Sequence, residues 1–304
     1  MRVLVTGGSG FIGSHVIDRL RARNIDVRIF DMVMPPYRTD AEFYHGSLLN
    51  FEEVRMAMNG VSAVYHLAEV ADVVQDPHYA ESINTRGTMN VLEAARRGAI
   101  GRVIYGSTTS VYQSTDGDFL DEEASPRTVS DFYLATKIAS EHYCQSYAHL
   151  FGIDATILRS GTSYGPRDQS SSILPRFVQA ALRGEPLIIN GDGSQTVNLT
   201  YVKDIAEGNV LALLPKAANK VYNLSSETCL TIREVAETVQ RLIDNVEIEY
   251  VSSSDRDFPR KIISSKRAKD ELGWEPGVPF EEGARRYIAW LREELTSREK
   301  DIVI

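Results

Sequence analysis

A glycine-rich segment near the start of the chain constrains its fold more than any other feature. Residues 6–13 read Thr-Gly-Gly-Ser-Gly-Phe-Ile-Gly and follow the apolar run 3–5. Gly7 permits a tight turn, Gly10 lets backbone approach a pyrophosphate, and Gly13 allows close packing of a helix on a strand. The helix start then offers N–H groups and a positive dipole to phosphates. The motif predicts a dinucleotide site at the first strand–helix junction.

Short apolar runs alternate with longer amphipathic stretches through the first half of the chain. Strands are predicted at 3–5, 26–30, 63–67, 102–105 and 154–158, and helices at 11–23, 51–59, 78–97 and 131–150. Strands separated by helices of this length imply right-handed βαβ units and a parallel sheet covered on both faces. We therefore expect an α/β fold, a Rossmann-type doubly wound parallel sheet with a smaller, mainly C-terminal substrate-binding lobe.

An acidic residue, Asp31, ends the second predicted strand, 18 residues after Gly13. A carboxylate at this place can accept hydrogen bonds from the hydroxyls of an adenine ribose. It would also repel a 2′-phosphate, and no Arg or Lys follows it immediately. The sequence therefore favours NAD over NADP as the cofactor.

Turn signals become frequent after residue 165, at Gly165-Pro166, at 184–186 and at 190–194. Further helices are expected at 231–244, 266–272 and 280–295, followed by a loose tail. We predict an NAD-binding Rossmann domain over 1–165 with a returning segment around 196–225, and a substrate-binding lobe over 166–195 and 226–304.

Tyr133 and Lys137 form the motif that carries chemistry. Residues at i and i+4 share one face of a helix, so the phenol and the ammonium can point into the same cleft. Ionising a tyrosine with a pKa of about 10 costs roughly 4 kcal/mol near pH 7. A nearby Lys⁺ and an oxidised nicotinamide both favour the phenolate. A phenolate can accept the proton of a carbinol while hydride leaves for the nicotinamide. Lys137 can also donate to the nicotinamide ribose.

Several motifs together resemble one family. They are the glycine motif, Asp31, His66-Leu67-Ala68, Asn84, Ser107-Thr108, Tyr133 with Lys137, Tyr164-Gly165-Pro166-Arg167, the run 191–196 and Leu272-Gly273-Trp274-Glu275-Pro276. The chain resembles, over nearly its whole length, an extended short-chain dehydrogenase/reductase of the nucleotide-sugar epimerase/dehydratase family, similar to UDP-sugar 4-epimerases.

The resemblance implies roles for individual residues. Thr108 would hydrogen-bond the reacting hydroxyl and complete a triad with Tyr133 and Lys137. The cofactor would be held by Gly7, Gly10, Phe11, Ile12, Gly13, Asp31, Leu67, Ala68, Asn84 and Lys137. Residues 173–177, which include Arg176, and the strand 186–189 would hold the nucleotide base. Arg256 or Arg260 would supply charge to the diphosphate.

Departures from the family pattern bear on the reaction. Dehydratases of the family carry an Asp-Glu pair after the catalytic Thr, and Thr109-Ser110 stands there instead. The absence of these carboxylates disfavours 4,6-dehydration, and Ser110 also lacks the Glu usual in decarboxylating relatives. Epimerisation at C4 needs only Tyr133, Thr108 and NAD. It is therefore the leading interpretation, with a 4-ketosugar reductase or another sugar-modifying oxidoreductase as the alternative, and a non-catalytic dinucleotide sensor as the least favoured.

The substrate side is less regular. Thr162 with Arg167, and Thr109-Ser110 beside Thr108, are similar to the pattern of uronic-acid 4-epimerases, in which hydroxyls and an Arg can hold a sugar carboxylate. UDP-glucuronate is thus a candidate substrate beside UDP-glucose and UDP-galactose. Three further positions depart from the family pattern: Ser47 near the adenine, Glu69 where a small residue is usual, and Val197 where an Arg usually binds diphosphate.

Charge and composition limit the partners. The net charge of −9 and the lack of a dense Lys/Arg block argue against nucleic-acid or membrane binding. The apolar start is too short for a signal peptide, and no segment is long enough to span a bilayer, so a cytoplasmic location is expected. Cys144 and Cys229 belong to no metal-ligand pattern, so we expect reduced thiols and no metal. By resemblance, the helices over 78–97 and 131–150 would pair across a two-fold axis in a homodimer.

Overall fold

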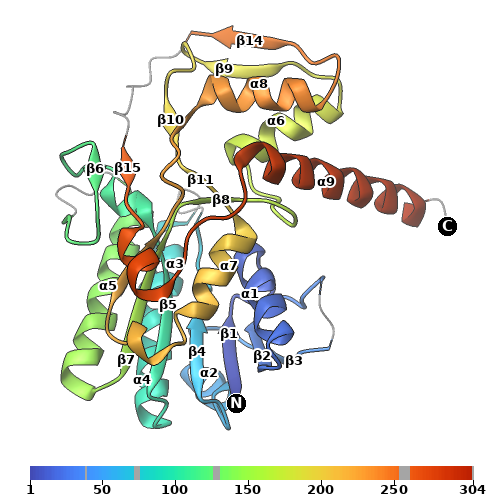
Figure 1. The fold of residues 1–304 in the computed structure, drawn as a ribbon. Helices are drawn as coiled ribbons and strands as arrows, with labels where there is room; N and C mark the ends of the chain where they lie inside the picture. The colour runs from blue at the N-terminus through green and yellow to red at the C-terminus, as the bar shows by residue number, and fades with distance from the viewer. Residues whose placement is uncertain (38–39, 72–75, 126–130, 253–260, 303–304) are drawn as a thin grey trace.

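Seven parallel strands form the central sheet of the computed structural model, which describes residues 1–37, 40–71, 76–125, 131–252 and 261–302 (Figure 1). Their order is β12-β7-β5-β4-β1-β2-β3, so the chain steps outward from β1 in one direction and then from β4 in the other. The strands are β1 (Arg2–Thr6), β2 (Asp26–Asp31), β3 (Glu42–His45), β4 (Ala63–His66), β5 (Arg102–Thr108), β7 (Asp154–Ser160) and β12 (Val221–Leu224). The predicted α/β fold with a doubly wound parallel sheet is confirmed. Its switch point lies between β1 and β4, where such sheets bind ligands at the carboxyl ends of the strands.

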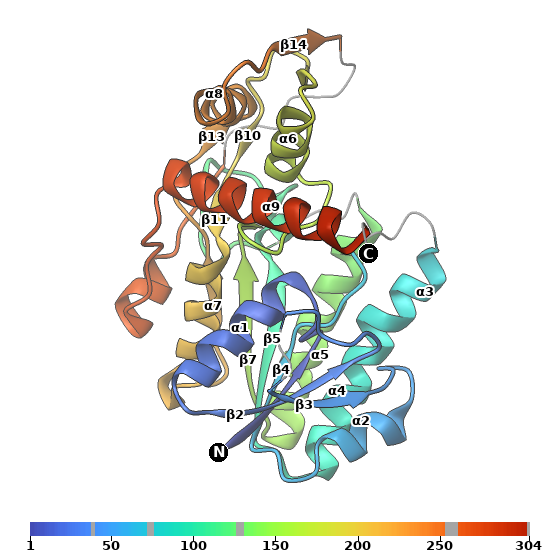
Figure 2. The ribbon, with the colours of Figure 1, turned by 90° about the vertical axis from the view of Figure 1, so that its right-hand side faces the viewer.

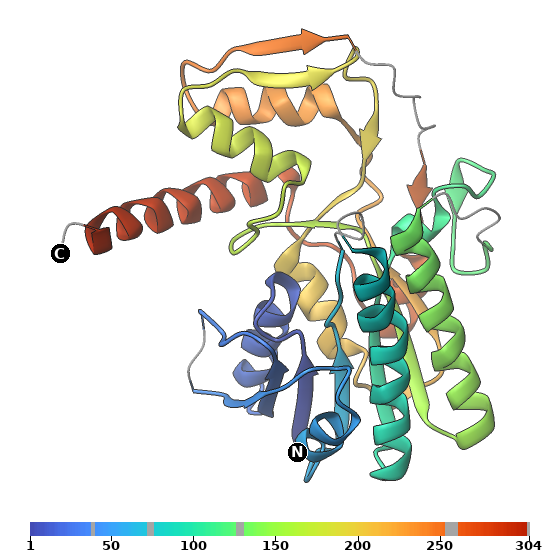
Figure 3. The same cartoon turned by 180° about the vertical axis from the view of Figure 1, so that it is seen from behind.

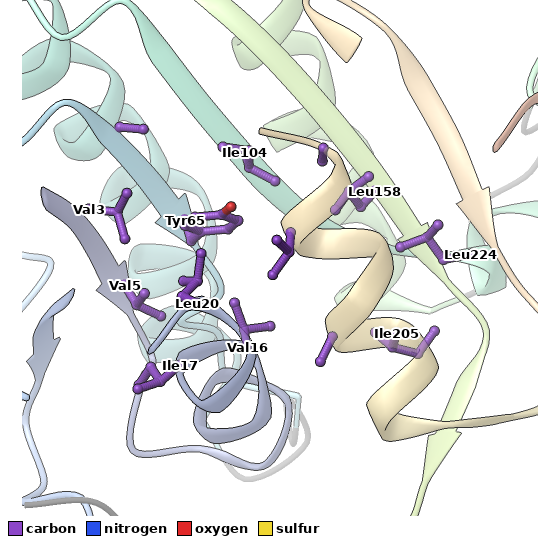
Figure 4. Packing of buried hydrophobic residues seen from close by; sticks show 14 of the residues in the cluster. Val3, Val5, Val16, Ile17, Leu20, Tyr65, Ile104, Leu158, Ile205 and Leu224 are labelled. Atoms are coloured by element: carbon purple, nitrogen blue, oxygen red, sulfur yellow. The ribbon is translucent and has the colours of Figure 1, made fainter. Parts of the chain in front are cut away.

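Helices α1 (Phe11–Ala22) and α7 (Val202–Leu211) cover one face of this sheet. The apolar side of α1 packs on β1, and Ile205 of α7 fills the same layer (Figure 4). Fully buried side chains of this layer are Val3, Val5, Val16, Ile17, Leu20, Tyr65, Ile104, Leu158, Ile205 and Leu224. This packing anchors the start of α1, and therefore the glycine segment, against the end of β1.

Helices α2 (Phe51–Ala57), α4 (Gly87–Arg97) and α5 (Phe132–Phe151) cover the opposite face, where α4 and α5 lie side by side (Figure 3). The helix predicted over 78–97 is present but not uniform: α3 (Pro77–Glu81) leads into a π-helical turn, Ser82–Arg86, before α4 begins. Single π turns inside helices are frequent at functional sites. Here the turn carries Asn84, which is buried.

A second group of elements lies beyond the carboxyl ends of the strands (Figure 2). It contains α6 (Ile173–Leu182), β9 (Leu187–Asn190), α8 (Ile232–Leu242), β14 (Ile248–Val251) and α9 (Phe280–Ile302), packed around their own apolar core. Thr231 begins α8 with a capping box to Glu234, which satisfies N–H groups at the helix start. The domain boundaries drawn from the sequence stay a prediction.

The remaining elements are short. They are the 3₁₀ turns Thr109–Tyr112 and Pro215–Ala217, the π turn Ala268–Leu272, and the strands β6 (Phe119–Leu120), β8 (Thr162–Tyr164), β10 (Thr196–Val197), β11 (Leu199–Tyr201), β13 (Leu230–Thr231) and β15 (Ile262–Ile263). Parallel pairing of β8 with β11 carries the chain across the carboxyl edge of the sheet.

One local prediction was wrong, and the two edge strands of the central sheet, β3 and β12, were not predicted. The expected loose tail is helical, because α9 continues past residue 295 to Ile302 with no Gly or Pro to end it. The edge strand β3 was not predicted, since its residues Glu42–His45 are half-buried or exposed and show no apolar alternation. Of the helices within the described residues, none combines the length and apolar character that a bilayer crossing demands.

Candidate active site

A cavity of about 600 Å³ opens at the carboxyl edge of the sheet and brings together several of the predicted site residues. Its lining comes from the glycine segment, the loop after β4, the ends of β5 and β7, and the loop after β8, and includes Phe11, Ile12, Glu69, Thr108, Tyr133, Thr162, Arg167 and Asp168. A larger cavity of about 860 Å³, lined by residues such as Glu227, Lys266 and Trp274, contains none of the predicted site residues. The smaller cavity is therefore the candidate active site.

The glycine segment folds as its sequence predicts. Gly7 has φ +70°, and a Cβ on it would lie 2.6 Å from the Ala68 nitrogen. A Cβ on Gly13 would lie 2.2 Å from the Gly7 carbonyl oxygen, so no other residue fits there. Gly10 precedes α1 and has no side chain to cap its first N–H groups. These groups stay available to phosphates, so the segment fits a bound dinucleotide.

Asp31 lies at the end of β2, beside the glycine segment. Its carboxylate accepts hydrogen bonds from the backbone N–H groups of Ser9, at 3.1 Å, and Val33, at 3.2 Å. A carboxylate has about four acceptor positions, so capacity remains for ribose hydroxyls. Asp31 thus ties the two cofactor segments together and fits the role predicted for it.

Tyr133 and Lys137 lie one turn apart near the start of α5, where Asp131 caps the helix by accepting from the Tyr133 N–H at 2.6 Å. The Tyr133 side chain lines the cavity, whereas the Lys137 side chain is only 3% exposed. Lys137 Nζ donates to the Gly106 carbonyl oxygen at 2.5 Å and lies 4.5 Å from the ring centroid of Tyr105. These contacts hold the Lys137 ammonium in one position, one helical turn after Tyr133 on α5.

A carboxylate joins this pair. Tyr133 Oη lies 3.1 Å from both carboxylate oxygens of Glu69, and Lys137 Nζ donates to Glu69 Oε2 at 2.7 Å. Burial raises the pKa of the Tyr133 phenol, the Glu69 carboxylate raises it further, and Lys137 opposes the shift. Burial lowers the pKa of Lys137, but Glu69 and the neighbouring phenols outweigh burial, so this pKa is well above its usual value.

Asn84 fixes the loop that carries Glu69. Its side chain donates to the Val70 carbonyl oxygen at 2.9 Å and to Thr136 Oγ1 at 3.0 Å, and accepts from the Val70 N–H at 2.8 Å. Each polar atom of the amide thus has a protein partner. The cofactor contact predicted for Asn84 stays a prediction, and the observed contacts make it a clamp between the loop after β4 and α5.

His66 ends β4 and begins the loop that carries Glu69. Its ring nitrogens lie 2.8 Å from Thr6 Oγ1 and 2.9 Å from Thr88 Oγ1. Burial lowers the pKa of His66 to about 3, and Lys137 adds to this effect, so the imidazole is neutral. Leu67 and Ala68 follow, and Ala68 packs directly on Gly7 as a lining of the predicted cofactor cleft.

The hydroxyl residues after β5 separate into two groups. Thr108 lines the cavity with Tyr133, as its predicted role in holding the reacting hydroxyl requires. Its Oγ1 also accepts from the Ser110 N–H at 3.1 Å. Thr109 and Ser110 lie in the following 3₁₀ turn and are not among the described lining residues. Their predicted contact with substrate stays a prediction.

The predicted cationic residues on the substrate side are dispersed. Arg167, with φ +72°, reaches the cavity but pairs with Asp18 of α1 at 2.9 Å and stacks over the Tyr37 ring. Thr162 is exposed on the cavity wall. Arg176 is exposed on α6 over the Phe177 ring and is not a described lining residue. Arg256 and Arg260 lie outside the described residues.

Two acidic residues of the cavity were not predicted as site residues. Glu69 drew notice only as a departure from a small residue, and nothing in the sequence signalled its contact with Tyr133. Asp168 is 2% exposed, and its Oδ2 has no hydrogen-bond partner among the described residues. Burial raises the pKa of Asp168. Its position directly after Gly165-Pro166-Arg167 was the one available signal.

Fold and site together fit a dinucleotide-binding enzyme in which Tyr133 borders a cavity at the switch point of the sheet and Lys137 lies one helical turn further along α5. Residues 3–225 match the model of the NAD dependent epimerase/dehydratase family, and the chain belongs to this family. The resemblance found in the sequence is thereby confirmed, and so is NAD as the cofactor of the family.

Relatives of known name cover nearly the whole chain. A putative UDP-glucose 4-epimerase of Methanocaldococcus jannaschii is 29% identical over 95% of this chain and 98% of its own. UDP-glucuronic acid decarboxylase 1 of Xenopus tropicalis is 31% identical over 97% of this chain and 73% of its own. The structure of a Thermotoga maritima UDP-glucose 4-epimerase with UDP-glucose has a TM-score of 0.89 at 29% identity, covering 97% of this chain and 100% of that one. The class is thus nucleotide-sugar epimerases and dehydratases.

Proposed function

We propose that the protein is an NAD-dependent nucleotide-sugar 4-epimerase. One observation carries the proposal: the cavity presents the Tyr133 phenol beside Thr108, while hydroxyl residues, Thr109 and Ser110, follow Thr108 where dehydratases of the family have carboxylates. Reversible oxidation at C4 needs one proton-transfer group and one hydroxyl contact, and both are present. Similarity to UDP-glucose 4-epimerases supports the same reaction.

Each residue then has a defined task. The glycine segment and Asp31 would hold NAD, which would supply reversible hydride transfer at C4. The Tyr133 phenolate accepts the proton of the C4 hydroxyl, and the resulting phenol gives a proton back to the 4-keto oxygen after the sugar has presented its other face. Thr108 holds the reacting oxygen. Lys137 lowers the cost of forming the phenolate.

The charges of the cavity favour a neutral hexose over a uronic acid. Among the described lining residues Arg167 is the one basic side chain, and Asp18 already holds it. Glu69 and Asp168 line the same cavity and would repel a sugar carboxylate. Within the proposal, UDP-glucose or UDP-galactose is therefore the leading substrate and UDP-glucuronate the second.

A nucleotide-sugar 4-ketoreductase is the second candidate function. The contact between Tyr133 and Glu69 favours it, because a phenol held protonated is ready to give a proton to a ketone. A non-catalytic dinucleotide sensor has less support, since Tyr133 is present and lines the cavity.

The purified protein should be incubated with UDP-, GDP-, dTDP- and CDP-sugars without added cofactor, and the products identified by NMR. We expect interconversion of UDP-glucose and UDP-galactose. Conversion of a 4-keto sugar only when NADH is supplied, with matching NADH consumption, would replace the epimerase proposal with the reductase. The absence of any conversion by either route would contradict both.

The cellular setting is part of the proposal. We infer a cytoplasmic homodimer in which α4 and α5 pair with the same helices of a second copy. Met89 on α4 and Phe151 on α5 are large apolar side chains exposed on these helices, which a partner would cover. Sedimentation velocity should give twice the chain mass of 33.9 kDa, and a monomer across micromolar concentrations would contradict this inference.

A further inference from the structure

The loop after β4 holds Glu69 rigidly against the proposed proton-transfer group. Ala68 packs closely on Gly7, because a Cβ atom placed on Gly7 would lie 2.6 Å from the backbone nitrogen of Ala68. On the other side, Val70 is bound through both its backbone N–H and its carbonyl oxygen by Asn84. The backbone of Glu69 is therefore held through both neighbours, which places its side chain beside Tyr133 and Lys137.

The carboxylate of Glu69 occupies a shared position between phenol and ammonium. It accepts from Tyr133 Oη at 3.1 Å and from Lys137 Nζ at 2.7 Å, while Lys137 is otherwise bound to the Gly106 carbonyl oxygen. The Glu69 side chain is 35% exposed and lines the cavity, so this contact faces the space where substrate would bind. A carboxylate that accepts from a phenol stabilises the protonated phenol.

We propose that Glu69 is a positioning residue that sets the proton affinity of Tyr133. Its carboxylate accepts the hydrogen bond of the protonated phenol. It also offsets part of the positive charge of Lys137, and this charge would otherwise favour the phenolate. This opposes the oxidising step, which needs phenolate, and favours the returning step, which needs phenol. The inference rests on the proposed role of Tyr133.

Other ionisable groups around Tyr133 do not replace this contact. Lys137 on α5 favours the phenolate, and Tyr105 on β5 is a buried phenol whose pKa burial raises to about 12. His66 on β4 is neutral because burial lowers its pKa. Asp131 binds the Tyr133 backbone N–H, and Asp168 lines the cavity, where its carboxylate accepts from the Ser170 N–H.

Glu69→Gln tests the inference because glutamine keeps the size of the side chain and removes its charge. The chain has 14 tyrosines, so the signal of Tyr133 must be isolated as a difference. Phenolate absorbance should be titrated in wild type and in Glu69→Gln, and the titration curve of the same protein with Tyr133→Phe should be subtracted from each. We expect the Tyr133 pKa to fall by about one to two units in Glu69→Gln. Glu69→Ala should shift it in the same direction.

The pH profile of turnover provides a second readout. Loss of the carboxylate should move the acidic limb of kcat to lower pH by the same amount as the phenol pKa, because phenolate then forms more readily. Glu52→Gln on α2, an exposed carboxylate paired with Arg55, is the matched control and should change neither curve.

The outcomes separate this inference from the proposed function. An unchanged Tyr133 titration in both Glu69 variants would overturn the inference even if the enzyme epimerises sugars. A lowered pKa supports it even if the sugar panel shows no epimerisation, since the titration needs no substrate. A Tyr133 pKa shift of the same size in Glu52→Gln would show that the change follows the net charge of the protein and not the Glu69 contact, and would also overturn the inference.

Discussion

Two carboxylate–cation clusters share helix α5 but differ in their surroundings. One turn after Lys137, Glu141 pairs with Arg159 of β7 at 2.7 Å and accepts from Ser107 at 2.6 Å. The side chains of Glu141 and Arg159 are 5% and 8% exposed. In the other cluster the carboxylate of Glu69 is 35% exposed, although its partner Lys137 is buried. The first cluster is closed and the second is open on one side.

The difference separates a structural task from a chemical one. Arg159 also donates to Tyr112 Oη at 2.6 Å, so every group of the closed cluster has fixed protein partners. Such a cluster cannot exchange partners without leaving a buried charge unpaired, which is strongly unfavourable. Glu69 borders a cavity, where a ligand hydroxyl or water can replace a protein partner. Similar groups packed against one helix therefore have only protein partners in one place and remain open for the proposed proton transfer in the other.

Replacement of the phenol should have the largest effect. Tyr133→Phe is expected to lower kcat by about 10²–10⁴-fold, because the proton acceptor is lost. Binding of NAD and sugar should remain largely intact, since among the described residues the Tyr133 hydroxyl bonds Glu69 alone. Steady-state kinetics and calorimetric titration measure the two effects. Activity within a few fold of wild type would remove Tyr133 from the proposed mechanism.

Opening the closed cluster should instead reduce stability. Glu141→Ala leaves the charge of Arg159 buried without its partner and is expected to lower the free energy of unfolding by about 3–5 kcal/mol. Urea unfolding gives this value. Glu52→Ala is the control, because Glu52 pairs with Arg55 on the exposed face of α2 and should cost less than about 1 kcal/mol. Equal losses in the two variants would contradict the distinction between buried and exposed pairs.

The sequence predicted the sheet and the cofactor loop because both depend on local patterns. Apolar periodicity marks the buried strands, and only glycine fits where Gly13 approaches Gly7. The contact between Glu69 and Tyr133 joins residues 64 positions apart, so no local pattern indicates it. The π turn that carries Asn84 packs against α5, and no pattern in its own residues led to its prediction.

Arg167 and Asp18 form a third carboxylate–cation pair, at the rim of the cavity. Replacing Arg167 should have the smallest of the predicted effects, a small change in ligand affinity. The sequence suggested that it binds a sugar carboxylate, whereas its guanidinium pairs with Asp18, which is 32% exposed. We expect Arg167→Ala to weaken UDP-glucose and UDP-glucuronate alike, by less than about fivefold, because a partly exposed pair is worth about 1 kcal/mol or less. Calorimetric Kd values for both ligands measure this. A loss confined to UDP-glucuronate would restore the carboxylate role. Asp18→Ala is the matched variant: by releasing the guanidinium, it should improve binding of UDP-glucuronate relative to UDP-glucose, which would make the rim pair a determinant of substrate charge.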